Sequence, residues 1–416
     1  MAAHLYSFSS RLALLILLGF TTSTAASPTS AGKSSSGAAK ALYFLTNDTP
    51  SNAVVSLQIN PDGLLSLGSV TPTNGSGSVA LNSTNQPATP DALVSQSALA
   101  LAGTSLFAVN AGSNTLTMLS IDPSNPTLLT ALGDPLPIPG DFPNTVAASS
   151  KHNLICVGTT GIRAGISCTS FSPTRGLLRP FDTPRPLGLN QTTPPVGPTN
   201  TLSHVFFSAD ESALFATVKG DPATNKTGSF SSFSVLPSKS CNNAPASVST
   251  QEIKSIPSGT AVLFGSRPIP GSTNRVFATD ASFGAVVLDV DASTGEATAR
   301  ARGEVAGQVA TCWVAISEMT GTAFVTDVGV NRVVEMGLED ARVLGVVDMQ
   351  GGGLDRAGLG LIDLVAEGGF VYALAPGDGS VEAAVAVVDV LGRREVQRFG
   401  VGGVAGRNSM GMVVWG

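Results

Sequence analysis

The chain has 416 residues and carries 23 Lys and Arg against 29 Asp and Glu, which gives a formal net charge of −6 at pH 7. Charged residues make up 12% of it, whereas roughly 25% is typical of soluble globular proteins. The longest basic run is the pair Arg393–Arg394. The composition therefore argues against a nucleic-acid surface.

The first 26 residues predict a secretory signal peptide. Arg11 precedes the apolar run 12–20, and the small residues Thr24 and Ala26 follow at the spacing that signal peptidase requires. Nine apolar residues are too few to span a bilayer. Residues 27–40 are rich in Ser and Gly and predict a flexible leader. Because no later segment is long and apolar enough to span and the C-terminus lacks a lipid-anchor signal, we expect an exported protein, extracellular or cell-wall associated.

Asparagine sequons agree with export. Five Asn-x-Ser/Thr motifs follow the predicted signal peptide, and they start at Asn47, Asn74, Asn82, Asn190 and Asn225. A single sequon arises easily by chance, but five behind a signal peptide indicate a glycoprotein of the eukaryotic secretory route.

From residue 41 onward the pattern is β throughout. The stretch "SLFAVNAGSNTLTMLSID" (105–122) reads as two short strands around a polar turn. Similar hairpins begin near residues 42, 106, 154, 214, 276, 323 and 371. A repeat of roughly 50 residues that holds about four short strands is typical of a propeller blade. Residues 41–416 therefore predict an all-β, seven-bladed β-propeller.

A small, apolar strand precedes each hairpin except the first. Examples are "SALALAG" before the second hairpin and "WVAISE" before the sixth, as a crowded innermost strand requires. The chain ends with one more such strand, "NSMGMVVWG". We therefore expect the C-terminal strand to complete the first blade and close the ring, which removes exposed sheet edges.

The two faces of the predicted ring differ in the length of their loops. We call the face where the innermost strands begin the upper face. The turns of the lower face are mostly tight, whereas long connections at 74–96, 133–143 and 183–200 lie on the upper face. Long loops on a rigid scaffold often carry function, so we expect the site at the upper face.

His204 is the candidate acid or base of that site. It opens the innermost strand "HVFFSAD" at the predicted channel mouth, and a histidine titrates near neutral pH. The alternative is a histidine that only hydrogen-bonds a neighbouring loop. His152 falls in a lower turn and reads as a surface residue.

Acidic and arginine residues are also predicted at the upper face. Asp327 and Glu382 end or begin strands there, and each is either a partner of His204 or a turn cap that accepts backbone N–H groups. Arg163, Arg332 and Arg407 would suit a carboxylate-bearing ligand through bidentate pairing. Singly, each arginine could equally be a solubilising surface residue.

The sequence carries no sign of a cofactor or a metal. No His, Cys or Asp set has metal-ligand spacing, no Gly-rich phosphate loop opens a helix, and no Gly-x-Ser-x-Gly elbow occurs. Cys156 and Cys168 lie symmetrically on the two strands of one hairpin, so we expect a disulfide between them. The predicted register places Cys241 and Cys312 far apart, so either both are free or they pair and that register is wrong; the sequence leaves this open.

Several of these segments resemble a known family. The stretches "ALYFLTNDTPSNAVVSL", "SLFAVNAGSNTLTMLSIDPSNP" and "ICVGTTGIRAGISC" resemble secreted fungal proteins called 3-carboxymuconate cyclase-like, which belong to the lactonase-type seven-bladed propellers. The stretch "FVTDVGVNRVVEM" is similar to that superfamily's Asp-Leu-Gly-x-Asp motif, with Asn331 in place of the second acid. The resemblance covers residues 41–416.

The resemblance implies the reversible closure of a muconate to its lactone, or hydrolysis of a lactone, with a small carboxylate or lactone as ligand and no cofactor. On this hypothesis His204 is the acid or base, Asp327 or Glu382 is its partner, and the three arginines bind carboxylate. The alternative is a non-catalytic adhesin or antigen that binds a host or cell-wall surface, because all five sequons fall on the upper face.

Overall fold

The computed structural model describes residues 40–238, 245–349 and 360–416, all within the compact unit Ala38–Gly416. The predicted signal peptide, almost all of the predicted leader and Cys241 lie outside the described residues. The described part is all-β, and its only helical piece is the 3₁₀ turn η1 (Pro222–Thr224). None of its helices is long and apolar enough to cross a membrane.

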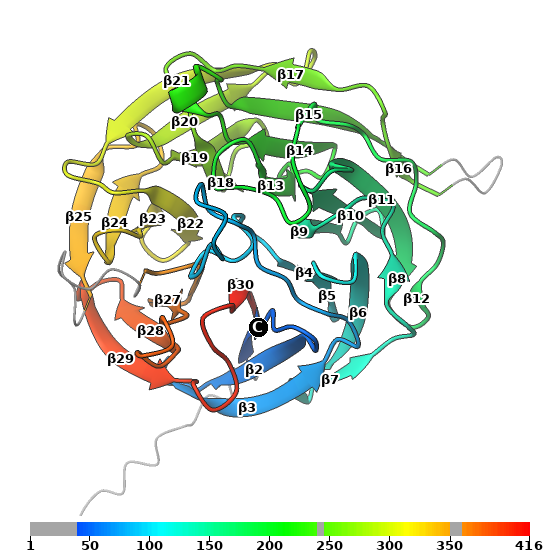
Figure 1. Cartoon of the computed structure of the whole chain (residues 1–416). Coiled ribbons are helices and arrows are strands. Elements are labelled where there is room, and N and C mark those ends of the chain that lie inside the picture. The colour runs from blue at the N-terminus through cyan, green and yellow to red at the C-terminus, as the bar shows by residue number, and fades with distance from the viewer. Residues whose placement is uncertain (1–39, 239–244, 350–359) are drawn as a thin grey trace, which may run out of the picture. The chain divides into compact units, whose positions relative to one another are not determined.

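The strands form seven antiparallel sheets, which are the blades of the propeller (Figure 1). We number the blades along the chain and name the strands of each blade from the innermost outward. Blade 1 contains β30 (Met410–Trp415), β1 (Lys40–Leu45), β2 (Ala53–Ile59) and β3 (Leu65–Pro72). Blade 2 contains β4 (Leu99–Ala102), β5 (Ser105–Asn110), β6 (Thr115–Asp122) and β7 (Asn125–Ala131), with β8 (Leu136–Pro137) also paired to β6. Blade 3 contains β9 (Pro143–Ser149), β10 (Leu154–Thr159), β11 (Gly165–Ser172) and β12 (Gly176–Leu177).

The second half of the ring follows the same plan. Blade 4 contains β13 (Leu202–Phe207), β14 (Ala213–Val218), β15 (Ser229–Leu236) and β16 (Ser247–Val248), with β17 (Ile253–Ser255) also paired to β15. Blade 5 contains β18 (Leu263–Pro268), β19 (Arg275–Asp280), β20 (Gly284–Val290) and β21 (Ala297–Glu304). Blade 6 contains β22 (Thr311–Ser317), β23 (Thr322–Asp327), β24 (Arg332–Gly337) and β25 (Val343–Asp348). Blade 7 contains β26 (Leu364–Glu367), β27 (Phe370–Ala375), β28 (Ala384–Asp389) and β29 (Arg394–Gly400).

The C-terminal strand closes the ring, as the sequence predicts. Strand β30 pairs antiparallel with β1, and Ala41 lies opposite Trp415 in their register. The prediction of seven four-stranded blades with this closure is confirmed. Each blade buries apolar side chains against its neighbours, and the largest fully buried ones include Trp313, Tyr43 and Tyr372.

Tight turns between blades depend on a few glycines. Gly63 lies in the turn between β2 and β3, next to blade 7, and adopts φ +81°. A Cβ atom there would lie 2.0 Å from the Phe370 ring. The Gly63 carbonyl accepts a hydrogen bond from the Tyr372 hydroxyl at 2.9 Å. Because only glycine adopts such a φ without strain, this position fixes how blade 1 meets blade 7.

The predicted disulfide between Cys156 and Cys168 is present. The two cysteines lie directly opposite each other in the register of β10 and β11. Cys312, in the inner strand β22, is a buried free thiol. Nothing in the described part of the chain therefore contradicts the expected register.

Candidate functional site

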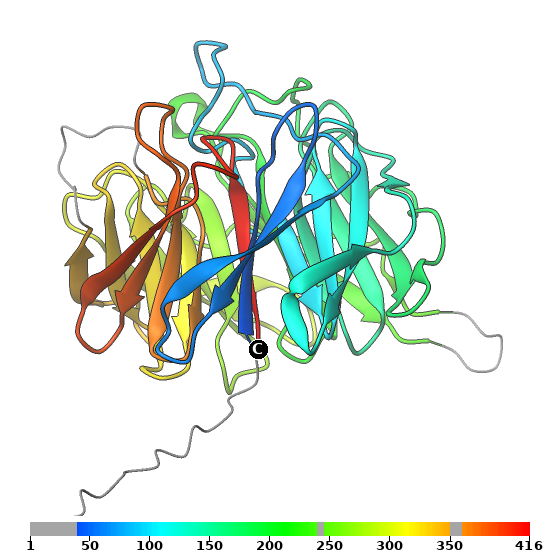
Figure 2. The same ribbon diagram turned by 90° about the horizontal axis from the view of Figure 1, so that it is seen from below.

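A loop closes the upper end of the central channel. The connection between β3 and β4 crosses the centre of the ring in Figure 1 and rises at the end of the molecule opposite the C-terminus in Figure 2. We call residues 91–97 the plug segment. Its residues Ala92 to Gln96 are at most 1% exposed. The face expected to be open is thus covered.

Hydrogen bonds fasten the plug segment to several blades. The Trp313 indole donates to the Ser95 carbonyl at 3.0 Å, and the Gln96 amide donates to the Val314 carbonyl at 2.9 Å. Across the ring, the Asn144 amide donates to the Leu93 carbonyl at 3.2 Å. Because these partners come from blades 3 and 6, the plug segment bridges opposite walls of the channel.

A buried charge also holds the plug segment. The Lys219 ammonium donates to the Val94 carbonyl at 2.6 Å and lies 4.5 Å from the centre of the Phe264 ring. Burial lowers the pKa of Lys219, which the Asp91 carboxylate partly offsets, and burial raises the pKa of Asp91. Among the described residues, Asp91 Oδ1 is buried without a hydrogen-bond partner.

Below the plug segment lies a cavity of about 510 Å³. Ser97, His204 and Arg267 line its upper part, and Glu211 and Glu367, which follow or end inner strands, line its lower part. Ala209, which also lines the cavity, is exposed in the short turn after β13. The cavity therefore runs along the inner strands and opens at the lower face.

His204 lies inside this channel rather than on an exposed rim. It is 1% exposed, its Nε2 lies 2.9 Å from Ser97 Oγ, and its Nδ1 accepts the backbone N–H of Ser266 at 3.2 Å. Since Nδ1 is an acceptor, the neutral ring carries its proton on Nε2 and donates it to Ser97. Burial lowers the pKa of His204 well below its usual value, and the charge of Arg267 lowers it further. In this arrangement His204 is a neutral hydrogen-bond donor.

Arg267 supplies the positive charge of the cavity. Its Nε donates to the Val314 carbonyl at 3.3 Å, and its terminal nitrogens have no hydrogen-bond partner among the described residues. Burial lowers the pKa of Arg267, and the Asp363 carboxylate raises it. The edge formed by the two terminal nitrogens can therefore pair with a carboxylate in a bidentate manner.

Asp363 positions the upper end of the site. It is fully buried, and its oxygens accept the backbone N–H groups of Leu364 at 2.8 Å and Met412 at 3.0 Å, together with that of Ser97. Burial raises the pKa of Asp363 to about 7, although the charge of Arg267 opposes this shift. Asp363 thus connects blades 7 and 1 to the plug segment.

The backbone around these residues is strained. Ser97 adopts φ +65°, Asp363 adopts φ +72° and Val94 adopts φ +51°. Such values cost non-glycine residues on the order of 1–3 kcal/mol, and they concentrate at functional sites. Their occurrence at the plug segment and its Asp363 anchor makes the channel the strongest candidate site.

Two residues predicted for the site instead bind each other. The Asp327 carboxylate accepts the backbone N–H of Val309 at 2.8 Å and the Nε of Arg332 at 2.9 Å. Arg332 also donates to the Ala306 carbonyl at 2.9 Å. Asp327 therefore caps a loop of blade 6, which is the alternative that the sequence left open, and it does not contact His204.

Glu382 and Arg407 lie elsewhere on the surface. Glu382 is exposed, and its carboxylate accepts the backbone N–H of Gly402 at 2.9 Å within blade 7. Arg407 is exposed in the loop before β30. Neither residue lines the channel cavity.

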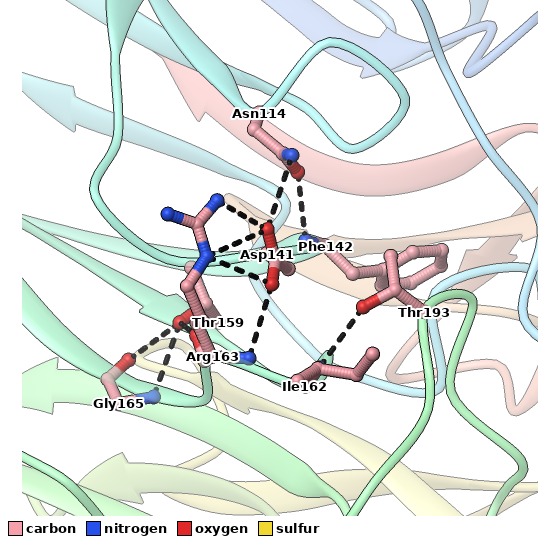
Figure 3. A network of polar contacts seen from close by, with 8 residues as sticks. All are labelled: Asn114, Asp141, Phe142, Thr159, Ile162, Arg163, Gly165 and Thr193. Carbon is pink, nitrogen blue, oxygen red and sulfur yellow. Dashed lines mark hydrogen bonds and ion pairs between the residues drawn. The ribbon is translucent and has the colours of Figure 1, made fainter.

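Arg163 is likewise tied to a neighbouring loop. Its guanidinium pairs with Asp141 at 2.6 and 3.0 Å, and its backbone N–H donates to the same carboxylate at 3.1 Å (Figure 3). The hydrogen bonds from Arg163 lower the pKa of Asp141. The structure thus does not gather the three predicted arginines around a common ligand.

The sequons differ in their exposure. Asn74, Asn190 and Asn225 are exposed, and Asn82 is partly exposed. The Asn47 side chain is fully buried, and its Nδ2 donates to the Ser78 carbonyl at 2.8 Å. A glycan on Asn47 would have to break this hydrogen bond and unpack the loop, so Asn47 is the least accessible of the five predicted positions.

Within residues 40–238, 245–349 and 360–416, no group of three or more His, Cys, Asp or Glu side chains could hold a metal ion. The chain matches no protein-family model and no curated protein. Solved structures do match. The periplasmic gluconolactonase of Pseudomonas aeruginosa shares 14% identity with a TM-score of 0.64, over 91% of this chain and 99% of that one.

A candidate 6-phosphogluconolactonase from Bacteroides uniformis shares 13% identity with a TM-score of 0.58, over 91% of this chain and 99% of that one. A similar protein from Bacteroides fragilis shares 10% identity with a TM-score of 0.57, over 91% and 98%. The chain is thus a seven-bladed propeller whose fold is similar to that of these lactonases. At identities this low, structural similarity shows the fold alone, and the reaction has to be inferred from the residues of the site.

Sequence reasoning missed Ser97, Arg267 and Asp363 as site residues. A signal for Arg267 exists, because it is the only charged residue within the body of the seven small, apolar inner strands, where Glu367 stands at a strand end. Ser97 aligns with His204 in the repeat, but its contact across the channel depends on the path of the plug segment. Asp363 precedes β26 and carries no local motif.

Proposed function

We propose that the protein binds a small carboxylic acid or its lactone in the central channel and interconverts the open and closed forms. The observation that carries this proposal is the half-buried Arg267 guanidinium, which lines the cavity and whose terminal nitrogens have no hydrogen-bond partner among the described residues. A half-buried cation that presents free N–H donors to a cavity favours an anionic ligand there.

The neighbouring pair gives the proposal its chemistry. His204 donates from Nε2 to Ser97, which leaves the Ser97 hydroxyl proton free to donate to a carbonyl oxygen. In lactone hydrolysis, water adds to the carbonyl carbon and the ring C–O bond breaks, so that a hydroxy acid forms. Donors aimed at the carbonyl oxygen stabilise the charge that develops on it, and Arg267 holds the carboxylate of the acid.

Closure of 3-carboxy-cis,cis-muconate and hydrolysis of sugar lactones are the two reactions we propose to test. Ultraviolet absorbance follows loss of the muconate, and titration of released acid follows lactone hydrolysis. We expect turnover of one of these two substrates in the native protein and in Arg163→Gln, and its loss in Arg267→Gln. Turnover that is equal in all three proteins would contradict the proposal.

A second candidate is a secreted surface glycoprotein that binds such ligands without turnover. It is favoured by the disulfide, which is typical of oxidising compartments, and by exposed sequons at Asn74, Asn190 and Asn225. Binding of the carboxylate that is measured by calorimetry and lost in Arg267→Gln, without any turnover, would select this candidate. Export itself is tested by the mass shift of the secreted protein after glycosidase treatment.

A further inference from the structure

The cavity changes character from its upper to its lower part. Ser97, His204 and Arg267 form the polar upper end. Partly exposed apolar residues line the part of the cavity below them. Among them, Ala148, Ile316 and Ala366 come from three different blades and lie toward the lower ends of their strands. A ligand anchored at Arg267 therefore extends along apolar side chains.

The length of the cavity follows from strand geometry. His204 and Ser208 both line it and are four positions apart on and just beyond β13. At about 3.3 Å per residue, this corresponds to roughly 13 Å along the channel. The cavity thus has room for a chain of several carbon atoms below the carboxylate.

Two carboxylates stand at the lower end. Glu211 accepts hydrogen bonds from Ser149 and from the backbone N–H of Lys151, and Glu367 pairs with Lys40. Both glutamates line the cavity, whereas Lys40 and Lys151 do not. A second negative group at the far end of a ligand would therefore face Glu211 and Glu367.

From this gradient we infer that the ligand is a medium-chain monocarboxylic acid or its alkyl lactone, which enters from the lower face and points its apolar tail back toward that opening. The inference rests on the proposed function and narrows its substrate class. Of the two reactions proposed above, it favours lactone hydrolysis over closure of a carboxymuconate, whose additional carboxylates would lie among apolar side chains or beside the glutamates.

Calorimetric titration with four probes tests this inference on the native protein. Octanoate has the expected form, and suberate has the same chain length with a second carboxylate. Acetate keeps the charge without the tail, and 1-octanol keeps the tail without the charge. We expect octanoate to bind about 100-fold more tightly than acetate, because its extra methylenes are buried. We expect suberate and 1-octanol to bind at least about 10-fold more weakly than octanoate.

Variants locate each effect. Arg267→Gln should weaken octanoate about 10-fold, with Arg267→Lys as a milder change and Arg163→Gln as the exposed control. The double variant Glu211→Gln/Glu367→Gln should raise the affinity for suberate until it is close to the affinity for octanoate. If either Arg267 variant fails to fold, the four-probe comparison on the native protein still decides the question.

The outcomes separate this inference from the proposed function. Suberate or acetate binding as tightly as octanoate, with all binding lost in Arg267→Gln, overturns the inference and leaves the proposed function standing. Absence of binding for every carboxylate overturns both. Octanoate binding that is unaffected in both Arg267 variants also overturns both, because the ligand would then occupy another site.

Discussion

The two ends of the channel are built in opposite ways. The upper end has the longest loops, but the plug segment fills it and hydrogen-bonds to Asn144, Lys219 and Trp313. The lower end has short turns, and the cavity opens there between Glu211 and Glu367. Long loops on this scaffold thus close the channel, and accessibility is found where the connections are shortest.

The two ends also hold their positive charges differently. Lys219 at the upper end donates to the plug segment and is sealed from solvent. Arg267 faces the cavity with its terminal nitrogens unpaired within the described residues. The first arrangement stabilises the fold, and the second is suited to a ligand.

The largest expected effect comes from breaking the upper end. Lys219→Met leaves the Val94 carbonyl without its donor and Asp91 without its compensating charge, so we expect a loss of about 3 kcal/mol in the free energy of unfolding. Urea denaturation measures it. The double variant Asp91→Asn/Lys219→Met should recover much of the loss, and an equal loss in both variants would contradict a charge-based role.

Blocking the lower end of the channel should slow ligand association, whereas the same substitution at the upper end should not. Ala209 is exposed and lines the lower opening, so Ala209→Trp should slow octanoate association about 10-fold, because productive entry is narrowed. Ser83 is exposed in the upper loop, and Ser83→Trp should leave association unchanged. Stopped-flow mixing compares the two rates. The reverse result would place the entrance at the upper face.

The depressed pKa of His204 predicts a pH dependence of stability. The unfolded chain gains a proton on this histidine near pH 6.5, whereas the folded chain resists protonation to a much lower pH. Stability is therefore lost as pH falls below about 6.5, by up to about 1.4 kcal/mol per pH unit from this group. Asp363 acts in the opposite direction, because its raised pKa favours the folded state as it becomes protonated.

Comparison with His204→Gln isolates the histidine. Between pH 7.5 and 5.5, the difference in unfolding free energy between native protein and variant should shrink as pH falls. Parallel pH profiles for the two proteins would show that His204 titrates normally in the folded state.

The smallest effect is expected at the exposed arginine of the upper face. Arg163 contacts Asp141 and its own loop, with 63% of its side chain exposed. Arg163→Gln should leave octanoate affinity within about 2-fold of the native value, since exposed pairs contribute little. A loss of octanoate affinity as large as that in Arg267→Gln would indicate that the ligand binds at the upper loops.

The sequence was sufficient for the architecture because each blade repeats one pattern. Alternating strands, the small inner strand and the spare strand at 410–415 determine seven blades and their closure, and the register of one hairpin places Cys156 opposite Cys168. These features depend on local periodicity, which can be read one repeat at a time.

The site was harder to predict because it depends on contacts between blades. His204 was located on an inner strand that lines the channel, but its neighbours Ser97 and Ser266 come from the plug segment and from blade 5. The path of the plug segment follows no repeat, so its burial could not be inferred. Asp327 caps a loop, and an acidic residue that caps a loop cannot be told from a catalytic acid by sequence alone.

The most direct test of the channel site is a crystal structure of the protein with 8-bromooctanoate, in which anomalous scattering locates the bromine. The account predicts the carboxylate at Arg267 and the bromine near the lower opening, between Glu211 and Glu367. Bromine found only above the plug segment or on the outer surface of a blade would contradict it.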